Sequence, residues 1–145
     1  MYILQTKSEE GIITLSDGTK LKLKITIIDI RESGFSPFGG INLITKTVGG
    51  IGVINIPQEL LDEVSDKPLA SSTDPPRDGW EIIDIVEYSP AIIEETIDTS
   101  KGTYLVRVQA EPVMCSRNMN YKTNLNEPFY WLSWVSKISW KPMKE

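Results

Sequence analysis

Strict alternation of side chains over residues 20–27 constrains this chain more than any other feature of its sequence. Lysine or threonine alternates with leucine or isoleucine through Lys20, Leu21, Lys22, Leu23, Lys24, Ile25, Thr26 and Ile27. Successive side chains of a strand point to opposite faces, so the pattern predicts a β-strand with one buried and one solvated face. Asp17-Gly18 stands between this run and an earlier apolar run, and this dipeptide favours a tight turn. The sequence therefore predicts a β-hairpin over residues 11–30.

Three lysines, Lys20, Lys22 and Lys24, form a row on the solvated face of the predicted strand. Exposed lysines discourage edge-to-edge pairing of sheets, and they can also neutralise phosphates. We interpret the row as a solvated face that guards an edge, with phosphate contact as the alternative.

Further apolar segments, separated by turn-forming residues, predict additional antiparallel strands. They cover residues 41–48, 51–56, 80–88, 91–97, 103–110 and 129–140. We interpret Gly49-Gly50 as the turn of a second hairpin, because apolar segments flank it on both sides. No Gly-Lys-Ser/Thr follows these glycines, which argues against a phosphate-binding loop. The alternating aromatic residues of 129–140 predict a central strand of the core.

Three segments are predicted to lie outside the strands. Pro57 at a first helical position, followed by acidic residues and by apolar residues on one side, predicts a short helix near residues 57–65. Repeated Pro and Gly predict a long surface loop at 65–79. Residues 33–40 are rich in turn formers, and we expect the two phenylalanines of this loop to pack on the core, with an exposed partner-binding tip as the alternative.

Together these elements predict a mostly β fold, an antiparallel Greek-key barrel or sandwich of about seven to nine strands with one short helix near residues 57–65. A chain of 145 residues has the size of one domain, so we expect a single core over residues 1–145. The Pro-rich loop at 65–79 would lie on its surface. The pattern leaves barrel and sandwich undecided.

The lack of histidine removes the commonest catalytic chemistry. The sequence contains no His and one Cys, Cys115. Ser-His-Asp catalysis, Cys-His catalysis and ordinary zinc sites therefore lack the side chains that they need. A lone Cys usually behaves as a small buried hydrophobe, which we expect for Cys115. No catalytic residue, metal or cofactor is predicted.

Targeting signals are not recognisable in the sequence. Residues 1–10 do not have the pattern of a signal peptide, and no apolar run approaches the ~20 residues of a membrane helix. We therefore expect a cytoplasmic protein without membrane contact. The net charge is −5, yet Lys and Arg outnumber Asp and Glu after residue 100. This asymmetry could mark a nucleic-acid face or mix with the acidic body on folding. The composition, rich in Ile, Lys and Glu, also resembles that of thermophile proteins.

Residues 114–126 carry the polar side chains that are hardest to explain by structure alone, and they lie between two predicted strands. The predicted contact residues are Arg117, Asn118, Asn120, Tyr121 and Lys122, with Trp131 on the solvated face of the following strand. Basic side chains could neutralise phosphates, Asn could hydrogen-bond base edges, and aromatic rings could stack on bases. An ordinary connection between strands is the alternative, because Asn, Arg and Tyr also brace loops.

Two acid pairs could in principle hold Mg²⁺ or act as a general acid and base. Glu94 and Glu95 are adjacent, so on a strand they would point to opposite faces. Asp74 and Asp78 match no calcium-loop spacing. We interpret all four as solvated charges.

Three classes of function are compatible with these features. A non-enzymatic binding or scaffolding protein, as a small subunit of an assembly or homo-oligomer, is favoured by the missing catalytic motifs and the aromatic residues near the end of the chain. It predicts a protein partner or self-association. A single-stranded nucleic-acid-binding β-barrel is the first alternative, and it predicts salt-sensitive binding. An enzyme that uses non-histidine chemistry is the second.

Overall fold

The computed structural model describes residues 2–143, and nine strands and one short helix lie among them. Five strands form one antiparallel sheet: β1 (Tyr2–Glu9), β5 (Trp80–Ile83), β7 (Ala91–Thr99), β8 (Gly102–Asn118) and β9 (Phe129–Pro142). Four strands form the other: β2 (Gly11–Leu15), β3 (Lys20–Glu32), β4 (Leu43–Asn55) and β6 (Ile85–Ser89). The helix α1 spans Gln58–Val64. The mostly β, antiparallel fold with one short helix is therefore confirmed.

The two sheets stack as a β-sandwich, and the described strands do not close into a barrel. β8 is the centre of the five-stranded sheet, because it pairs with β9 on one side and with both β7 and β5 on the other. The second sheet has the order β4-β3-β2-β6. The chain changes sheets at Asp84, between β5 and β6, and again at Pro90 before β7. The strand predicted over residues 80–88 is thus two short strands, one in each sheet.

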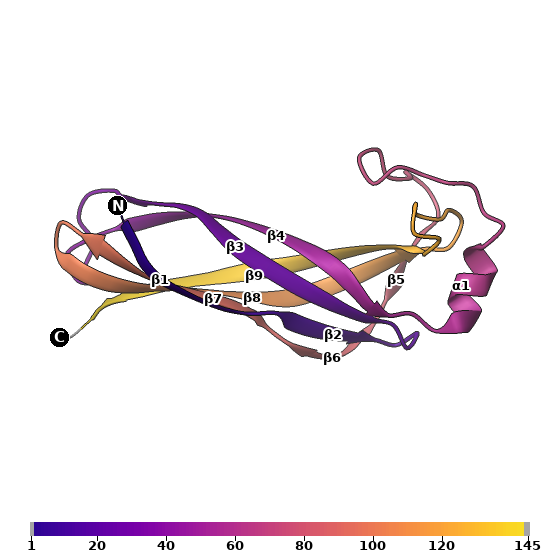
Figure 1. Ribbon diagram of the computed structural model, residues 1–145, viewed down its shortest axis with the longest axis horizontal. Coiled ribbons are helices and arrows are strands. Elements are labelled where there is room, and N and C mark those ends of the chain that lie inside the picture. The colour runs from indigo at the N-terminus through magenta and orange to yellow at the C-terminus, as the bar shows by residue number, and fades with distance from the viewer. Residues whose placement is uncertain (1, 144–145) are drawn as a thin grey trace.

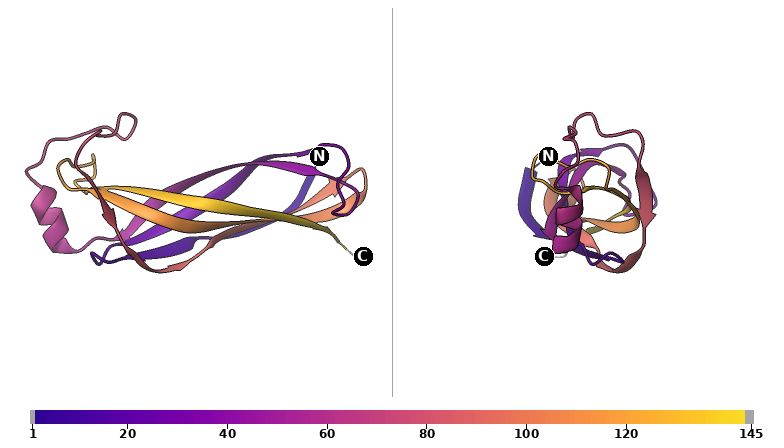
Figure 2. Two further views of the ribbon diagram at one scale, coloured as in Figure 1. Left: turned by 180° about the vertical axis from the view of Figure 1, so that it is seen from behind. Right: turned by 90° about the vertical axis from the view of Figure 1, so that its right-hand side faces the viewer.

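The strands run along the long axis of an elongated molecule (Figure 1). One end, which we call the loop end, carries α1, the Pro-rich loop of residues 65–79 and the β8–β9 loop of residues 119–128. The opposite end, the open end, holds both described ends of the chain. A view along the axis shows the two sheets around a common interior (Figure 2).

Alternate residues of both sheets fill this interior. The core includes Ile13, Leu15, Leu21, Leu23, Ile25 and Ile27 from one sheet and Ile93, Ile97, Tyr104, Val106, Val108 and Ala110 from the other. The lysines of β3 point away from it, so the alternation predicted over residues 20–27 is confirmed. β2 and β3 pair on either side of Asp17-Gly18, which confirms the first hairpin.

The second predicted hairpin is wrong, because residues 43–55 form one continuous strand, β4. Gly49 and Gly50 lie within the ladder between β3 and β4 instead of forming a turn. A Cβ atom on Gly49 would lie 2.7 Å from Cζ2 of Trp134. Gly49 therefore permits the close approach of the Trp134 ring, and close approach is a common reason for glycine inside a strand.

The loop between β3 and β4 also differs from its prediction, since its phenylalanines do not pack on the core. Phe35 is 80% exposed, and Phe38 is exposed as well. Phe38 meets Trp140 edge to face, with ring centroids 6.4 Å apart. A hydrogen bond within the loop orders it, since Ser36 Oγ donates to the backbone carbonyl of Ile41 at 2.6 Å. Local hydrogen bonds thus order this loop although neither phenylalanine ring is buried.

The strand assignments differ from prediction at three further places. β9 is an edge strand and not the predicted central strand, because it pairs with β8 alone. β8 takes the central position and continues to Asn118, through the first part of the segment 114–126 that was predicted as a loop. β1 has no counterpart among the predicted strands. Its side chains from Leu4 to Glu9 are exposed, so it lacks the apolar alternation that reveals a strand.

Candidate functional site

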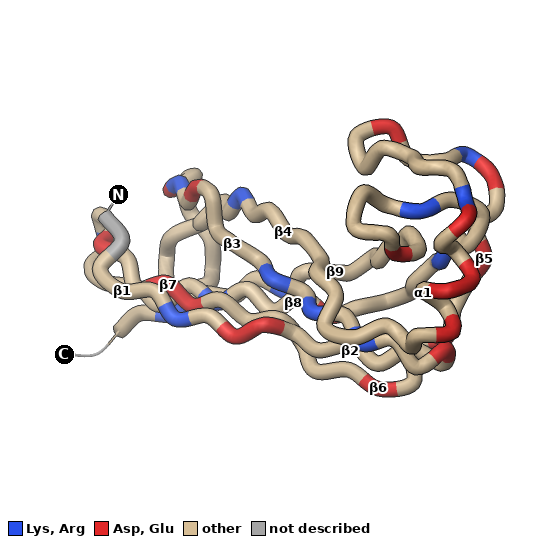
Figure 3. The backbone as a smooth tube through the Cα atoms, turned by 45° about the vertical axis from the view of Figure 1, so that its right-hand side comes forward, with Lys and Arg blue, Asp and Glu red and all other residues tan. Residues whose placement is uncertain are grey.

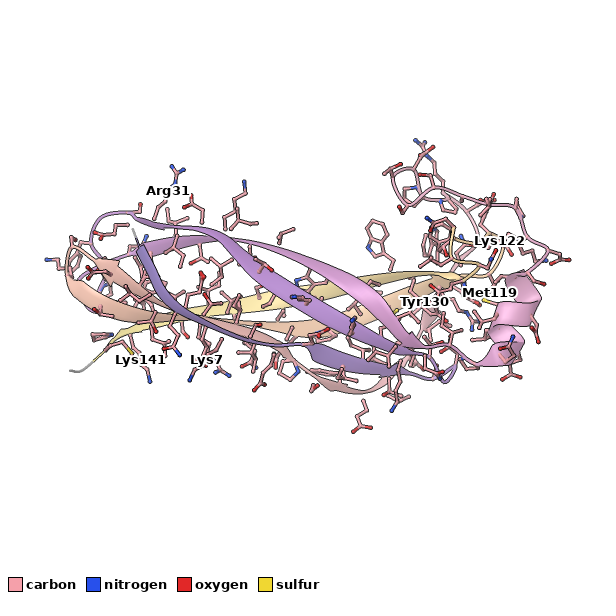
Figure 4. All side chains as sticks on the ribbon, in the orientation of Figure 1. Lys7, Arg31, Met119, Lys122, Tyr130 and Lys141 are labelled. Atoms are coloured by element: carbon pink, nitrogen blue, oxygen red, sulfur yellow. The ribbon has the colours of Figure 1, made fainter. Side chains whose placement is uncertain are left out.

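Arg117 lies on the face of β8 that is turned toward the other sheet. Its Nη1 donates to Oδ2 of Asp17, in the β2–β3 turn, at 3.1 Å, and its Nε donates to Oε1 of Glu81, on β5, at 3.0 Å. The hydroxyl of Tyr130, on β9, donates to the same Asp17 oxygen at 3.0 Å and lies 2.8 Å from the Thr19 hydroxyl. Figure 4 shows Tyr130 near the loop end of the sandwich. We call these five residues the Arg117 network.

The Arg117 network keeps its guanidinium charged and its phenol neutral. Burial lowers the pKa of Arg117, but hydrogen bonds and charges from Glu81 and Asp17 outweigh burial and raise it above its ordinary value. Burial is the largest cause that raises the pKa of Tyr130. The guanidinium is thus engaged by two carboxylates of its own chain, and it links β8 to the β2–β3 turn of the other sheet.

The two predicted asparagines brace the loop end. Asn118 is fully buried, and its Nδ2 donates to the carbonyl of Asp78 at 2.7 Å. Its Oδ1 accepts the backbone N–H of Asn120 at 2.9 Å. The side chain of Asn120 lies so close to Gly79 that a Cβ there would meet its Nδ2 at 2.5 Å. These contacts fix the end of the Pro-rich loop against the end of β8.

Tyr121 and Lys122 also make contacts within the chain. The Tyr121 hydroxyl donates to Oδ1 of Asp78 at 3.3 Å, and Nζ of Lys122 donates to the carbonyl of Ser65 at 2.8 Å. Lys122 also forms an isolated parallel bridge with Leu69. Figure 4 shows Lys122 beside α1. The two residues therefore link the β8–β9 loop to the segment that follows the helix.

Trp131 is the predicted contact residue whose ring stays on the surface, with 59% of the residue exposed. It points outward from β9 in one cross-strand row with Ser116 of β8 and Ile82 of β5. Trp80 meets it edge to face, with ring centroids 6.3 Å apart. A shallow hollow of about 210 Å³ lies here, lined by Pro75, Pro76, Trp80, Ser116 and Trp131. This surface, the Trp131 patch, is on the opposite face of the strands from the Arg117 network.

The long side of the four-stranded sheet formed by β4 carries one charged residue, Lys46, followed by an uncharged stretch. β4 pairs with β3 alone, so within the described chain no strand covers the backbone groups on its other side. Residues 47–55 of β4 contain no charged side chain, and Val48 and Ile54 are exposed. Figure 3 shows this uncharged stretch next to the lysines of β3. We call residues 47–55 the β4 edge.

A cleft of about 680 Å³ lies between β3 and β7 at the open end. Glu95 borders it with only 3% of the residue exposed, so its interpretation as a solvated charge is wrong. Its neighbour Glu94 points to the other face and pairs with Arg107 at 3.6 Å, while Asp74 and Asp78 are exposed, as predicted. The missed signal is the alternation of Ala91, Ile93, Glu95 and Ile97, which puts Glu95 on the buried face.

Cys115 is buried on β8, as predicted. Burial raises the pKa of its thiol to about 11. The thiolate is the nucleophilic form, so this raised pKa favours the less reactive thiol at neutral pH.

Within residues 2–143, no group of three or more His, Cys, Asp or Glu side chains is arranged to hold a metal ion. No helix in that range combines the length and the apolar character needed to cross a membrane. Comparisons with protein-family models, with curated proteins and with solved structures found no match. The fold defines the protein as a two-sheet antiparallel β-sandwich, and its surfaces are what point to a function.

Proposed function

We propose that this chain is a non-enzymatic binding protein that works as a subunit of a homo-oligomer, with the β4 edge as the surface along which copies pair. The observation that carries this proposal is the absence of charged side chains over residues 47–55, along an unpaired strand. An unpaired strand presents a row of free N–H and C=O groups, and natural proteins usually protect such rows with charges, bulges or covering loops.

Other edges of the sandwich carry that protection. Charged residues at those edges are Lys7 and Glu9 on β1, Glu87 on β6, and Lys137 and Lys141 on β9. The lysine row that was expected to guard an edge belongs to β3, where Lys20 and Lys22 lie between β2 and β4. The β4 edge is therefore suited to pairing with another strand.

A second copy of this chain supplies the matching strand. Antiparallel pairing of β4 with β4 of another copy is isologous, because each copy uses the same residues, and such a contact closes on a dimer instead of growing into a fibre. It would join two four-stranded sheets into one continuous sheet. A Cβ atom on Gly50 would meet nothing within 4 Å, so the outer surface here is open. Val48 and Ile54 add apolar side chains along the joint.

Single-stranded nucleic acid is the weaker candidate partner. Binding of single strands requires basic groups that are free for phosphates. Arg117 is bonded to two carboxylates and Lys122 to a backbone carbonyl. The Trp131 patch offers a ring for stacking, but its hollow is lined by no basic residue. Together with the net charge of −5, these contacts favour a protein partner.

An enzyme based on carboxylates is also weaker as a candidate. Carboxylate catalysis of the glycosidase kind needs two cooperating acids. In the cleft beside Glu95, Asp29 is paired with Arg31 and Glu32 accepts hydrogen bonds from Ser100, while Asp98 is exposed to solvent. Two of the three acids beside Glu95 are thus engaged within the chain, which favours a binding role for the cleft.

The oligomeric state tests the proposal. Sedimentation equilibrium over a wide range of protein concentrations should give twice the chain mass of 16.3 kDa. Val48→Lys, near one end of the β4 edge, should give the monomer mass, because an exposed lysine on an edge strand opposes pairing with another strand. Circular dichroism should show that the variant keeps its β structure.

Ile82→Lys is the matched control, because Ile82 is also an exposed aliphatic residue but lies on the other sheet, in the Trp131 patch. This variant should remain a dimer. A wild-type protein that is monomeric at every concentration would overturn the proposal. Dissociation by Ile82→Lys but not by Val48→Lys would overturn it too, and would move the interface to the Trp131 patch.

A further inference from the structure

The two sheets have different numbers of strands at the open end. β2 ends its pairing with β3 at Gly11↔Leu23, so β3 pairs with β4 alone from Lys24 onward. The sheet opposite still has β1, β7, β8 and β9 there. One consequence is that Thr6 of β1, in register with the inward-facing Glu95, is exposed to solvent. One side of β3 and the inner face of β1 are thus left without a covering strand.

The cleft of about 680 Å³ occupies this gap. Ile27 and Ile30 of β3 and Ile97 of β7 give it an apolar lining, while Asp29 and Asp98 add acidic groups. Glu32 accepts hydrogen bonds from the backbone N–H of Ser100 at 2.7 Å and from its hydroxyl at 2.6 Å. This contact ties β3 to the β7–β8 turn.

Glu95 is nearly fully buried in the cleft lining, and no cationic side chain among residues 2–143 pairs with it. Within the described residues its Oε1 has no hydrogen-bond partner, and the Thr6 hydroxyl is the contact that stabilises its charged form. Burial outweighs that contact and raises the pKa of Glu95. The basic residue of the cleft, Arg31, pairs with Asp29 at 2.6 Å and extends away from the sandwich (Figure 4). A buried carboxylate in this state is relieved either by a proton or by a cation that a partner brings to it.

We propose that the cleft binds an extended segment of a partner protein, which pairs with the free edge of β3 and places one lysine or arginine side chain on Glu95. Addition of a strand to an open sheet edge supplies main-chain hydrogen bonds, and alternate side chains of the added strand enter the pockets beneath. The apolar stem of Lys or Arg would lie along Ile27, Ile30 and Ile97. The acidic groups around the cleft favour a cationic segment over an anionic one.

This site is independent of the proposed self-association. β4 lies on one side of β3, and the cleft lies on the other. A monomeric protein would leave the cleft proposal untouched, and failure of the cleft to bind would leave the β4 edge untouched.

A blocked heptapeptide, acetyl-Thr-Val-Thr-Lys-Thr-Val-Thr-amide, is the probe, because its even-numbered side chains face one way when it is extended. Titration into ¹⁵N-labelled full-length protein should give saturable shifts confined to the amides of residues 24–32 and 95–99. The same peptide with norleucine in place of Lys keeps the stem and loses the charge. It should bind about tenfold more weakly, as expected for loss of a charge-assisted contact.

Glu95→Gln should weaken the lysine peptide by about the same factor and leave the norleucine peptide unchanged. Glu94→Gln is the matched control, since Glu94 is the adjacent acid on the opposite face, and it should change neither. Equal binding of the two peptides, no effect of Glu95→Gln, or no shifts at millimolar peptide would overturn the proposal. If n-butylamine bound as tightly as the lysine peptide, an amine alone would account for binding, and the proposal that the cleft recognises an extended peptide segment would be wrong.

Discussion

Asp17 at the loop end and Glu95 at the open end are both carboxylates withdrawn from water, but their surroundings differ. Asp17 accepts hydrogen bonds from Arg117, from Tyr130 and from the backbone N–H of Thr19. Glu95 has an oxygen without any partner among residues 2–143. A buried carboxylate is stabilising only when cations and donors replace the water that it has lost.

The number of strands explains the difference between the ends. At the loop end the β2–β3 turn, β5, β8 and β9 each contribute a side chain to the Arg117 network, so both sheets are linked there. At the open end β2 has ended and β3 faces the other sheet with β4 as its sole neighbour. Fewer strands at the open end supply fewer hydrogen-bond donors, so Glu95 lacks the partners that Asp17 has.

The largest effect is expected from removing the cation at the loop end. Arg117→Met keeps most of the apolar stem but leaves Asp17 and Glu81 without their shared partner. We expect the free energy of unfolding to fall by about 3 kcal/mol, the lower end for a broken buried pair, because Glu81 is half exposed. Urea denaturation at neutral pH and one protein concentration measures it. A fall in the free energy of unfolding of less than about 0.5 kcal/mol would mean that Arg117 contributes no more than a surface ion pair. Asp17 would then be no better compensated than Glu95.

A second prediction concerns the side of the sandwich where β4 and β9 meet, which is closed by Trp134 above Gly49. Gly49→Ala would place its Cβ 2.7 Å from the ring and 3.2 Å from Ile25 Cγ2. It should cost about 2 kcal/mol through overpacking. Gly50→Ala is the control, since nothing lies within 4 Å of its Cβ, and it should be neutral or slightly stabilising. Thermal melts measure both variants. Equal melting temperatures of Gly49→Ala and Gly50→Ala would mean that the Trp134 ring does not pack tightly on Gly49 and that this side is not closed.

The smallest effect is expected at Glu95. Its raised pKa means that the folded protein binds this proton more tightly than the unfolded chain does, so the contribution to stability is present below the ordinary pKa of 4.5 and is lost as the pH rises through the raised value. Gln does not ionise, so Glu95→Gln should be more stable than wild type by about 1 kcal/mol at neutral pH and equal to it near pH 4. Urea midpoints across this range measure the difference. A gain in stability of Glu95→Gln that is the same at pH 4 and at neutral pH would contradict the raised pKa of Glu95.

Prediction from sequence succeeded where the pattern is local and one-sided. The alternation of β3, the turn at Asp17-Gly18 and the short helix all depend on neighbouring residues, and each is observed. It failed at Gly49, because two glycines suit a turn and the close approach of a ring equally well. It also missed β1, whose exposed edge carries no apolar alternation.

The candidate sites were less predictable than the fold. Arg117 looks like a free base in the sequence, since its partner Asp17 lies 100 residues away in the chain. Glu95 looks solvated when it is considered with Glu94, although its place among Ala91, Ile93 and Ile97 indicates burial. Trp131 was correctly placed on the outward face of its strand, because that assignment needs only the alternation of β9.

The sequence alone determined the β class, the face that each well-patterned strand buries, and the absence of histidine chemistry. These properties follow from composition and from a period of two residues, and both are local. The tertiary structure decided which strands became edges, which carboxylate received a cation and which was left with a cleft. Those outcomes depend on segments far apart in the chain, because hydrogen-bond pairing and burial are properties of neighbours in space.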